Sequence, residues 1–141
     1  ASFTLTSPNL TGLGPIVSVQ IAVPDQLATI LGTAGTSPPL PVSVDAQIDT
    51  GASGCVIQTG IAAQLGLNPV GLIYINTPSS TKRPVPQYQV RLLLPNYLWA
   101  KMIVTEAPLQ GQNIQCLLGR DLLAYGLLVY NGPTNTFTLA F

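Results

Sequence analysis

The chain has 141 residues, of which 47% are hydrophobic and 7% charged, and it carries five cations, five anions and no histidine. This length and apolar content predict one folded domain, because disordered chains are typically polar and charged. The zero net charge argues against a nucleic-acid partner, and no apolar run reaches the ~18 residues of a membrane span. Without histidine, Ser-His and Cys-His catalysis are excluded and a zinc or copper site is disfavoured. We therefore expect neither a metal nor another cofactor.

Three strands are predicted in the first third of the chain. Apolar and polar residues alternate in the segments 2–6, 17–23 and 42–48, which is typical of half-buried strands. The link after residue 6 and the segment 25–39 are rich in glycine and proline, so both are predicted as loops.

The rest of the chain continues the β pattern. A hairpin is predicted over residues 72–94, with a polar turn region at its tip. One short helix is predicted at 61–65, capped by Thr59 and ended by Gly66, and another at 121–125. Further strands are predicted at 55–57, 98–105, 114–118, 127–130 and 136–141. The chain is therefore predicted to be mainly β, with one or two short helices.

Asp49 stands where the strand 42–48 must turn, and it begins the triplet Asp-Thr-Gly. The apolar strand would deliver this carboxylate into the interior, and the small residues after it leave room for another group to approach. Asp and Gly are also common turn residues, so a purely structural role is the alternative. Residues 117–121 (Leu-Leu-Gly-Arg-Asp) repeat the pattern of an apolar strand ended by a glycine, which favours the catalytic interpretation.

In this order and at this spacing, these features resemble the retropepsin-like aspartic proteases, single-domain relatives of pepsin that work as homodimers. The resemblance rests on residues 49–53 (Asp-Thr-Gly-Ala-Ser), 72–94 and 117–121, and it covers residues 15–141. It implies an all-β, retropepsin-like acid protease fold, closed and barrel-like, with a flap hairpin. It also implies a single protease domain over residues 1–141, with residues 1–14 as an N-terminal segment at the dimer interface.

Peptide hydrolysis without histidine, a metal or a covalent nucleophile needs two carboxylates that share one proton. The chain holds one Asp-Thr-Gly and no second such triplet, so the second carboxylate would be Asp49 of another copy. The resemblance thus implies a homodimeric aspartic endopeptidase, in which a water is activated between two Asp49 carboxylates against an extended polypeptide. The alternative is a non-catalytic peptide-binding or dimerisation module that keeps the fold.

The resemblance implies a role for each residue of these motifs. Asp49 would be the catalytic acid and base, Thr50 would hydrogen-bond across the dimer axis, and Gly51 and Ala52 would support the active-site loop. Asp121 is expected to be a helix N-cap. The residues expected to pack behind the loop are Leu117, Leu118, Gly119 and Arg120. The residues expected at the flap tip, against the substrate, are Thr77, Pro78, Ser79, Ser80, Thr81 and Lys82.

Several features depart from the retroviral pattern. The hairpin tip has no glycine, the segment 25–39 is longer than expected, and Ser53 stands where many retroviral members have a second aspartate. Arg120 thereby loses an expected partner, and it is interpreted either as an anchor of the loop or as an ordinary helix-end cation. In retroviral members the chain ends interleave into a dimer sheet; here they would do the same or form edge strands of one subunit. Cys55 and Cys116 could pair or stay reduced.

Overall fold

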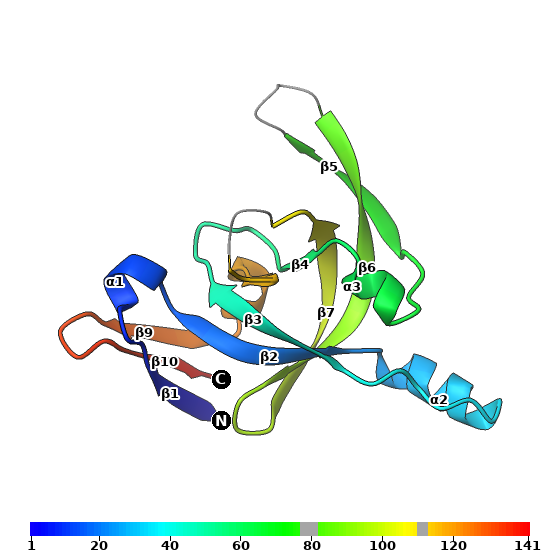
Figure 1. Cartoon of the computed structure of the whole chain (residues 1–141), viewed down its shortest axis with the longest axis horizontal. Coiled ribbons are helices and arrows are strands. Elements are labelled where there is room, and N and C mark those ends of the chain that lie inside the picture. Colours follow the sequence, from blue (N-terminus) through cyan, green and yellow to red (C-terminus); the bar gives the residue numbers. More distant parts are fainter. Residues whose placement is uncertain (77–81, 110–112) are drawn as a thin grey trace.

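The computed structural model describes residues 1–76, 82–109 and 113–141. A closed ring of strands forms the centre, a smaller sheet lies beside it, and a long hairpin projects from it (Figure 1). Within this described part of the chain, no helix has the length and apolar character needed to cross a membrane. The prediction of a mainly β, barrel-like fold with short helices is confirmed.

Six strands of the described chain form the ring. In order around it they are β2 (Ile16–Ala22), β3 (Val42–Ile48), β8 (Cys116–Leu118), β4 (Val56–Gln58), β7 (Leu98–Ala107) and β6 (Lys82–Leu94). The ring closes because β2 pairs with both β3 and β6. A further strand, β5 (Gly71–Asn76), pairs with β6 and lies outside the ring.

The core fills the inside of the ring, because alternate residues of each strand point inward. On β2, Val17, Val19 and Ile21 are at most 2% exposed, whereas Ser18 and Gln20 between them face solvent. Burying each such apolar side chain stabilises the fold by about 1.5–3 kcal/mol. A shift of one residue would turn this apolar set outward, so the hydrophobic pattern fixes the register of the ring.

The pairing of β8 places the candidate site. This strand lies between β3, to which it is parallel, and β4. β3 and β8 end side by side, with Ile48 opposite Leu118. Asp49, which follows β3, therefore lies beside Gly119, which follows β8. Two motifs that are far apart in the sequence thus meet at one end of the ring.

Both ends of the chain meet in a second sheet, which we call the terminal sheet. It contains β1 (Ser2–Thr6), β10 (Thr136–Ala140) and β9 (Leu127–Asn131), with β10 in the middle. Phe3, Phe137 and Leu139 pack from this sheet into the core and are at most 7% exposed. All five residues of β1 pair with β10, so within one chain the two end segments are already paired with each other.

Short helices connect the strands: α1 (Leu10–Leu13), α2 (Asp25–Thr33), α3 (Ile61–Gln64) and α4 (Arg120–Leu123). The prediction of a loop over 25–39 is wrong for its first part, where α2 forms. Asp25 in the first turn of α2 complements the helix dipole, and Gly32 comes near its end, where glycine is tolerated. The link after residue 6 contains α1, whose first turn is capped by the side chain of Asn9.

The predicted helix at 61–65 corresponds to α3, but its predicted cap is wrong. Gly60 and not Thr59 occupies the N-cap position, with a φ of 103° that favours glycine. The Glu106 carboxylate, from β7, accepts the N–H groups of Gly60 and Ala62 at 3.3 Å each. A residue distant in sequence thus supplies the cap.

Candidate active site

Asp49 lies in a tight turn at the end of β3. Its N–H donates to the Leu118 carbonyl at 2.9 Å, and its carbonyl accepts the Ala52 N–H at 3.1 Å. Its carboxylate Oδ1 accepts the Gly51 N–H at 2.8 Å, a charge-assisted hydrogen bond. Asp49 is half-buried, and Thr50 and Gly51 are exposed. The turn therefore holds the carboxylate in one orientation close to solvent.

The turn after β8 packs directly against the Asp49 loop. A Cβ on Gly119 would lie 2.5 Å from the carbonyl carbon and oxygen of Gly54, so only glycine fits there. The Arg120 N–H donates to the Ala52 carbonyl at 2.9 Å, and Arg120 Nη1 donates to the Thr50 carbonyl at 2.7 Å. Of the two interpretations of Arg120, these contacts favour an anchor of the loop.

Cys55 and Asp121 tie the same two segments together. The N–H and the thiol of Cys55 donate to the two carboxylate oxygens of Asp121, each at 3.2 Å. The Cys55 sulfur in turn accepts the Gly119 N–H at 3.4 Å. The prediction of Asp121 as a helix N-cap is wrong, because Gly119 occupies that position and the Asp121 carboxylate bonds Cys55. No sequence signal linked residues 55 and 121.

Both cysteines are free, buried thiols. Burial raises the pKa of Cys55; the Gly119 N–H opposes this shift, and the Asp121 charge adds to it. Burial likewise raises the pKa of Cys116 to about 12, with a smaller contribution from Asp121. Both thiols are therefore protonated at neutral pH, and Cys55 has the proton that it donates to Asp121.

A cleft of about 470 Å³ opens beside the Asp49 loop. Its walls come from that loop, from β5 and from the facing parts of β6 and β7. The lining residues are Gly51, Ala52, Ser53, Gly54, Cys55, Val56, Ile73, Ile75, Gln87, Ile103, Thr105 and Asp121. Apart from Asp121, which is bonded to Cys55, the lining is uncharged. Sequence reasoning did not name the three isoleucines, although the alternation of apolar residues along β5 and β7 was a usable signal.

The predicted hairpin over 72–94 is formed by β5 and β6, with Gly71 opposite Gln87 and Asn76 opposite Lys82. β7 pairs with β6 from Gln87 onward. In the described residues, the part of the hairpin between Gln87 and its tip therefore has only two strands, β5 and β6. This ribbon stands away from the ring in Figure 1. Of the expected tip residues, Lys82 is the exposed first residue of β6, whereas Thr77, Pro78, Ser79, Ser80 and Thr81 lie outside the described residues.

The remaining motif residues have clear places. Leu118 is fully buried behind the Asp49 turn, Leu117 is half-buried, and Ser53 is exposed. Asp45, on the strand that leads to Asp49, is exposed and accepts the Ser18 hydroxyl at 3.3 Å.

Comparisons with known proteins bear on the family and the fold. Residues 28–122 match the model of a family described as aspartyl protease, whereas no curated protein sequence matches the chain. The structure is similar to that of a retropepsin-like aspartic protease from Rickettsia conorii, with 13% identity and a TM-score of 0.56, covering 100% of this chain and 91% of that one. A retroviral protease-like domain of Ddi1 from Leishmania major matches with 14% identity and a TM-score of 0.47, covering 86% of each chain. The Rickettsia likeness confirms the predicted retropepsin-like fold.

Proposed function

Because the chain belongs to the aspartyl protease family, we propose that it is a homodimeric aspartic endopeptidase with Asp49 as the catalytic residue of each subunit. The observation that carries this proposal is the turn at the end of β3. It holds the Asp49 carboxylate through the Gly51 N–H at 2.8 Å, and the loop that follows lines the cleft. Residues 1–141 would act as one protease domain.

The second carboxylate comes from a second copy of the chain. The other acidic side chains of this copy already have bonding partners other than Asp49: Asp25, Asp45, Glu106 and Asp121. A two-fold axis that passes beside the Asp49 loop would bring two identical carboxylates together. One chain alone would hold half of the catalytic machinery.

Two such carboxylates share one proton, because like charges ~3 Å apart cannot both ionise. The ionised Asp49 takes a proton from a water, whose oxygen attacks the peptide carbonyl carbon, while the protonated Asp49 donates to the carbonyl oxygen. The tetrahedral intermediate then collapses: the leaving nitrogen takes the proton held by the pair, the C–N bond breaks, and one hydroxyl of the intermediate returns a proton to the pair, so the two carboxylates again share one proton. The two ionisations belong to the pair of residues and not to either one.

The neighbours of Asp49 keep the two loops in place. The Thr50 carbonyl is held by Arg120, and the Thr50 hydroxyl would hydrogen-bond across the axis to the other copy. Gly51 and Ala52 present no bulky side chain to the substrate backbone. Leu117, Leu118 and Gly119 support the loop from behind.

The cleft would take an extended polypeptide. Its apolar wall residues, Val56, Ile73, Ile75 and Ile103, favour apolar side chains of the substrate. The β5–β6 hairpin, with residues 77–82 at its tip, would act as the flap that closes over the bound peptide and excludes water. Backbone hydrogen bonds to an extended chain add affinity without sequence preference.

The substitution Asp49→Asn tests this proposal, because it keeps the side-chain size and removes the acid. Cleavage of an unfolded protein substrate near pH 5 should fall by at least about a thousandfold, with an unchanged circular dichroism spectrum and an unchanged mass in sedimentation. Asp45→Asn, on the exposed face of the same strand, is the matched control and should cleave normally.

Cleavage by Asp49→Asn at the wild-type rate would contradict the proposal. A wild-type protein that binds the unfolded substrate and leaves it intact would support the non-catalytic module.

A further inference from the structure

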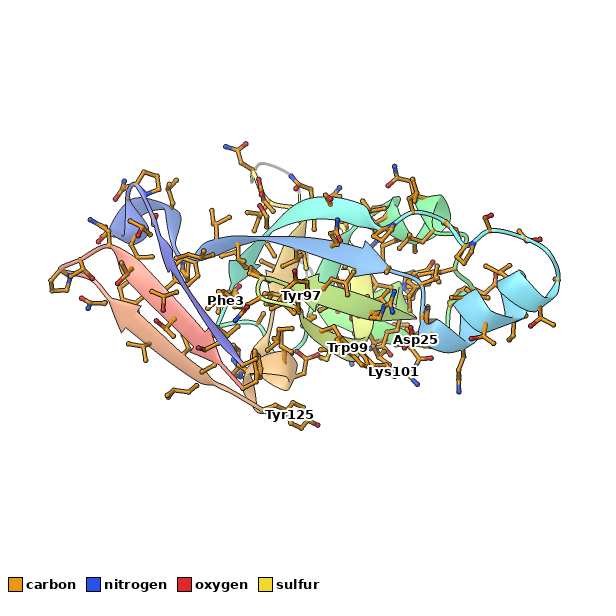
Figure 2. The ribbon with its side chains drawn as sticks, turned by 90° about the horizontal axis from the view of Figure 1, so that it is seen from below. Phe3, Asp25, Tyr97, Trp99, Lys101 and Tyr125 are labelled. Carbon is orange, nitrogen blue, oxygen red and sulfur yellow. The ribbon has the colours of Figure 1, made fainter. Side chains whose placement is uncertain are left out.

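The charges of this chain are unevenly distributed. All five cations and all five anions lie between Asp25 and Asp121, so residues 1–24 and 122–141 carry no charged side chain. Those two segments contain the whole terminal sheet. In Figure 2 this sheet is set to the left of the ring, whereas the labelled Asp25 and Lys101 lie on the right half of the view, away from it. The terminal sheet thus presents no charged side chain to solvent.

β9 is an outer strand of this sheet, and in the described part of the chain only β10 pairs with it. Leu127, Val129 and Tyr130 of β9 are exposed by 63%, 46% and 51%. Edge strands of soluble proteins are usually protected from further pairing by a charge, a proline or a bulge. The edge of β9 is apolar and has none of the ten charges, so it resembles a strand that is covered by a partner.

We propose that β9 pairs with β9 of a second copy, antiparallel about a two-fold axis, and that this contact builds the dimer on which the proposed function rests. In the centred register, Val129 lies opposite its own copy. A charged residue at this edge would meet the same charge across the axis, which destabilises a strand pair. The uncharged, apolar edge of β9 is instead complementary to itself.

The fold connects this edge to the catalytic loop. β9 follows α4, whose first residue, Arg120, bonds the Thr50 carbonyl. The turn between β9 and β10 is tied to α1 through the Asn135 side chain, which accepts the Leu10 N–H at 3.0 Å. α1, this turn and the end of β3 lie on the same side of the molecule (Figure 1). A two-fold axis beside β9 would therefore lie on the same side of the molecule as the Asp49 loop.

The same contact explains why the chain ends need not cross between subunits. β1 is already paired with β10 over its whole length, so a partner strand has no gap in the sheet to enter. Two complete terminal sheets would join edge to edge into one continuous sheet with β9 and its copy at the centre. This differs from the interleaved ends of the retroviral members.

Charge variants at Val129 test the proposal. Val129→Lys and Val129→Glu, each alone, should weaken the dimer by at least about tenfold, because like charges would meet across the axis. An equimolar mixture of the two should recover the dimer as a mixed pair. The same two substitutions at Ile30, which is 63% exposed on α2 at the far end of the molecule, are the control and should leave the dimer unchanged.

The dimer is measured by sedimentation, and every variant is made both with Asp49 and with Asp49→Asn. The β9 contact would be overturned if both single Val129 variants kept the dissociation constant of the wild-type dimer, or if the mixture did not recover the dimer. Either result would leave the proposed enzyme intact. A wild-type protein that cleaves as a monomer would overturn the shared pair of Asp49 residues. A β9-dependent dimer that never cleaves would support the contact and contradict the enzyme.

Discussion

The two sides of the cleft are held in different ways. On one side, the cleft base (residues 49–56 and 118–122) consists of two loops whose backbones touch at Gly54 and Gly119. Arg120 and Asp121 each add a hydrogen-bonded tie between these loops. On the other side, the part of the β5–β6 hairpin between Gln87 and its tip is a two-stranded ribbon in the described residues.

This difference matches what each side would have to do. A carboxylate that shares a proton must be held within a fraction of an ångström, which favours a loop fixed by several independent contacts. A flap must open to admit a polypeptide and close again, and an isolated two-stranded ribbon is only marginally stable by itself. The comparison predicts that stability is sensitive to changes in the cleft base, whereas substrate affinity is sensitive to changes in the hairpin.

The largest effect is expected for Gly119→Ala. Its Cβ would meet the Gly54 backbone at 2.5 Å, so the two loops of the cleft base must separate. The free energy of unfolding should fall by about 3 kcal/mol, the upper end for overpacking, and cleavage should be lost with it. Urea unfolding and a cleavage assay measure both effects.

Gly32→Ala is the matched control. Nothing lies within 4 Å of the added Cβ, and the site is inside α2, so this variant should be slightly more stable than wild type. If Gly119→Ala were as stable as Gly32→Ala, the description of the cleft base as tightly interlocked would be wrong.

A smaller effect per pH unit is expected at alkaline pH, through two buried thiols, Cys55 in the cleft base and Cys116 on β8. In the folded chain the pKa of Cys116 is about 12, against an ordinary value of 9.0, and the pKa of Cys55 is also raised. Above about pH 9 the unfolded chain releases protons that the folded chain retains, so the free energy of unfolding falls as pH rises. The slope should be about 1.4 kcal/mol per pH unit for each thiol.

Urea unfolding between about pH 8 and pH 11 measures this slope in wild type and in Cys116→Ala. The variant should lose the contribution of one thiol and give a shallower dependence, whatever its stability at neutral pH. Equal slopes in the two proteins would contradict a buried, protonated Cys116.

The smallest effect on stability is expected for Ile75→Ser in the hairpin. Ile75 lines the cleft from β5, so this variant should raise KM several-fold while changing the free energy of unfolding by less than about 1 kcal/mol. Tyr74→Ser, at an adjacent β5 position that is 65% exposed and does not line the cleft, is the control and should change neither quantity. If Ile75→Ser lost as much stability as Gly119→Ala, the contrast between the two sides of the cleft would be wrong.

Local patterns were sufficient to predict the centre of the molecule. The alternation in the segment 42–48 and the triplet that begins at Asp49 indicated a strand and its turn, and residues 117–121 indicated a second strand ended by glycine. The structure pairs these strands. The same alternation predicted both end segments as strands, but whether they pair with each other depends on the whole fold.

Other features carry no local signal. α2 has no fully buried residue and packs against the core only in part, through Leu27 and Ala28, so its apolar face is short, and its glycine suggested a loop. The bond between Cys55 and Asp121 spans 66 positions and exists because β8 inserts between β3 and β4. The cap that Glu106 supplies to α3 likewise requires β7 to lie beside β4.

The two chain ends are bonded to each other. The Ala1 ammonium donates to the Phe141 carbonyl at 3.0 Å, and the Phe141 N–H donates to the Ala1 carbonyl at 2.8 Å. The ends lie on the side of the molecule opposite the β5–β6 hairpin (Figure 1). A polypeptide fused to either end would leave from one point and would have to pass around the ring to enter the cleft of its own molecule. For the proposed protease, cutting next to either end would therefore be easier between molecules, in trans, than within one molecule.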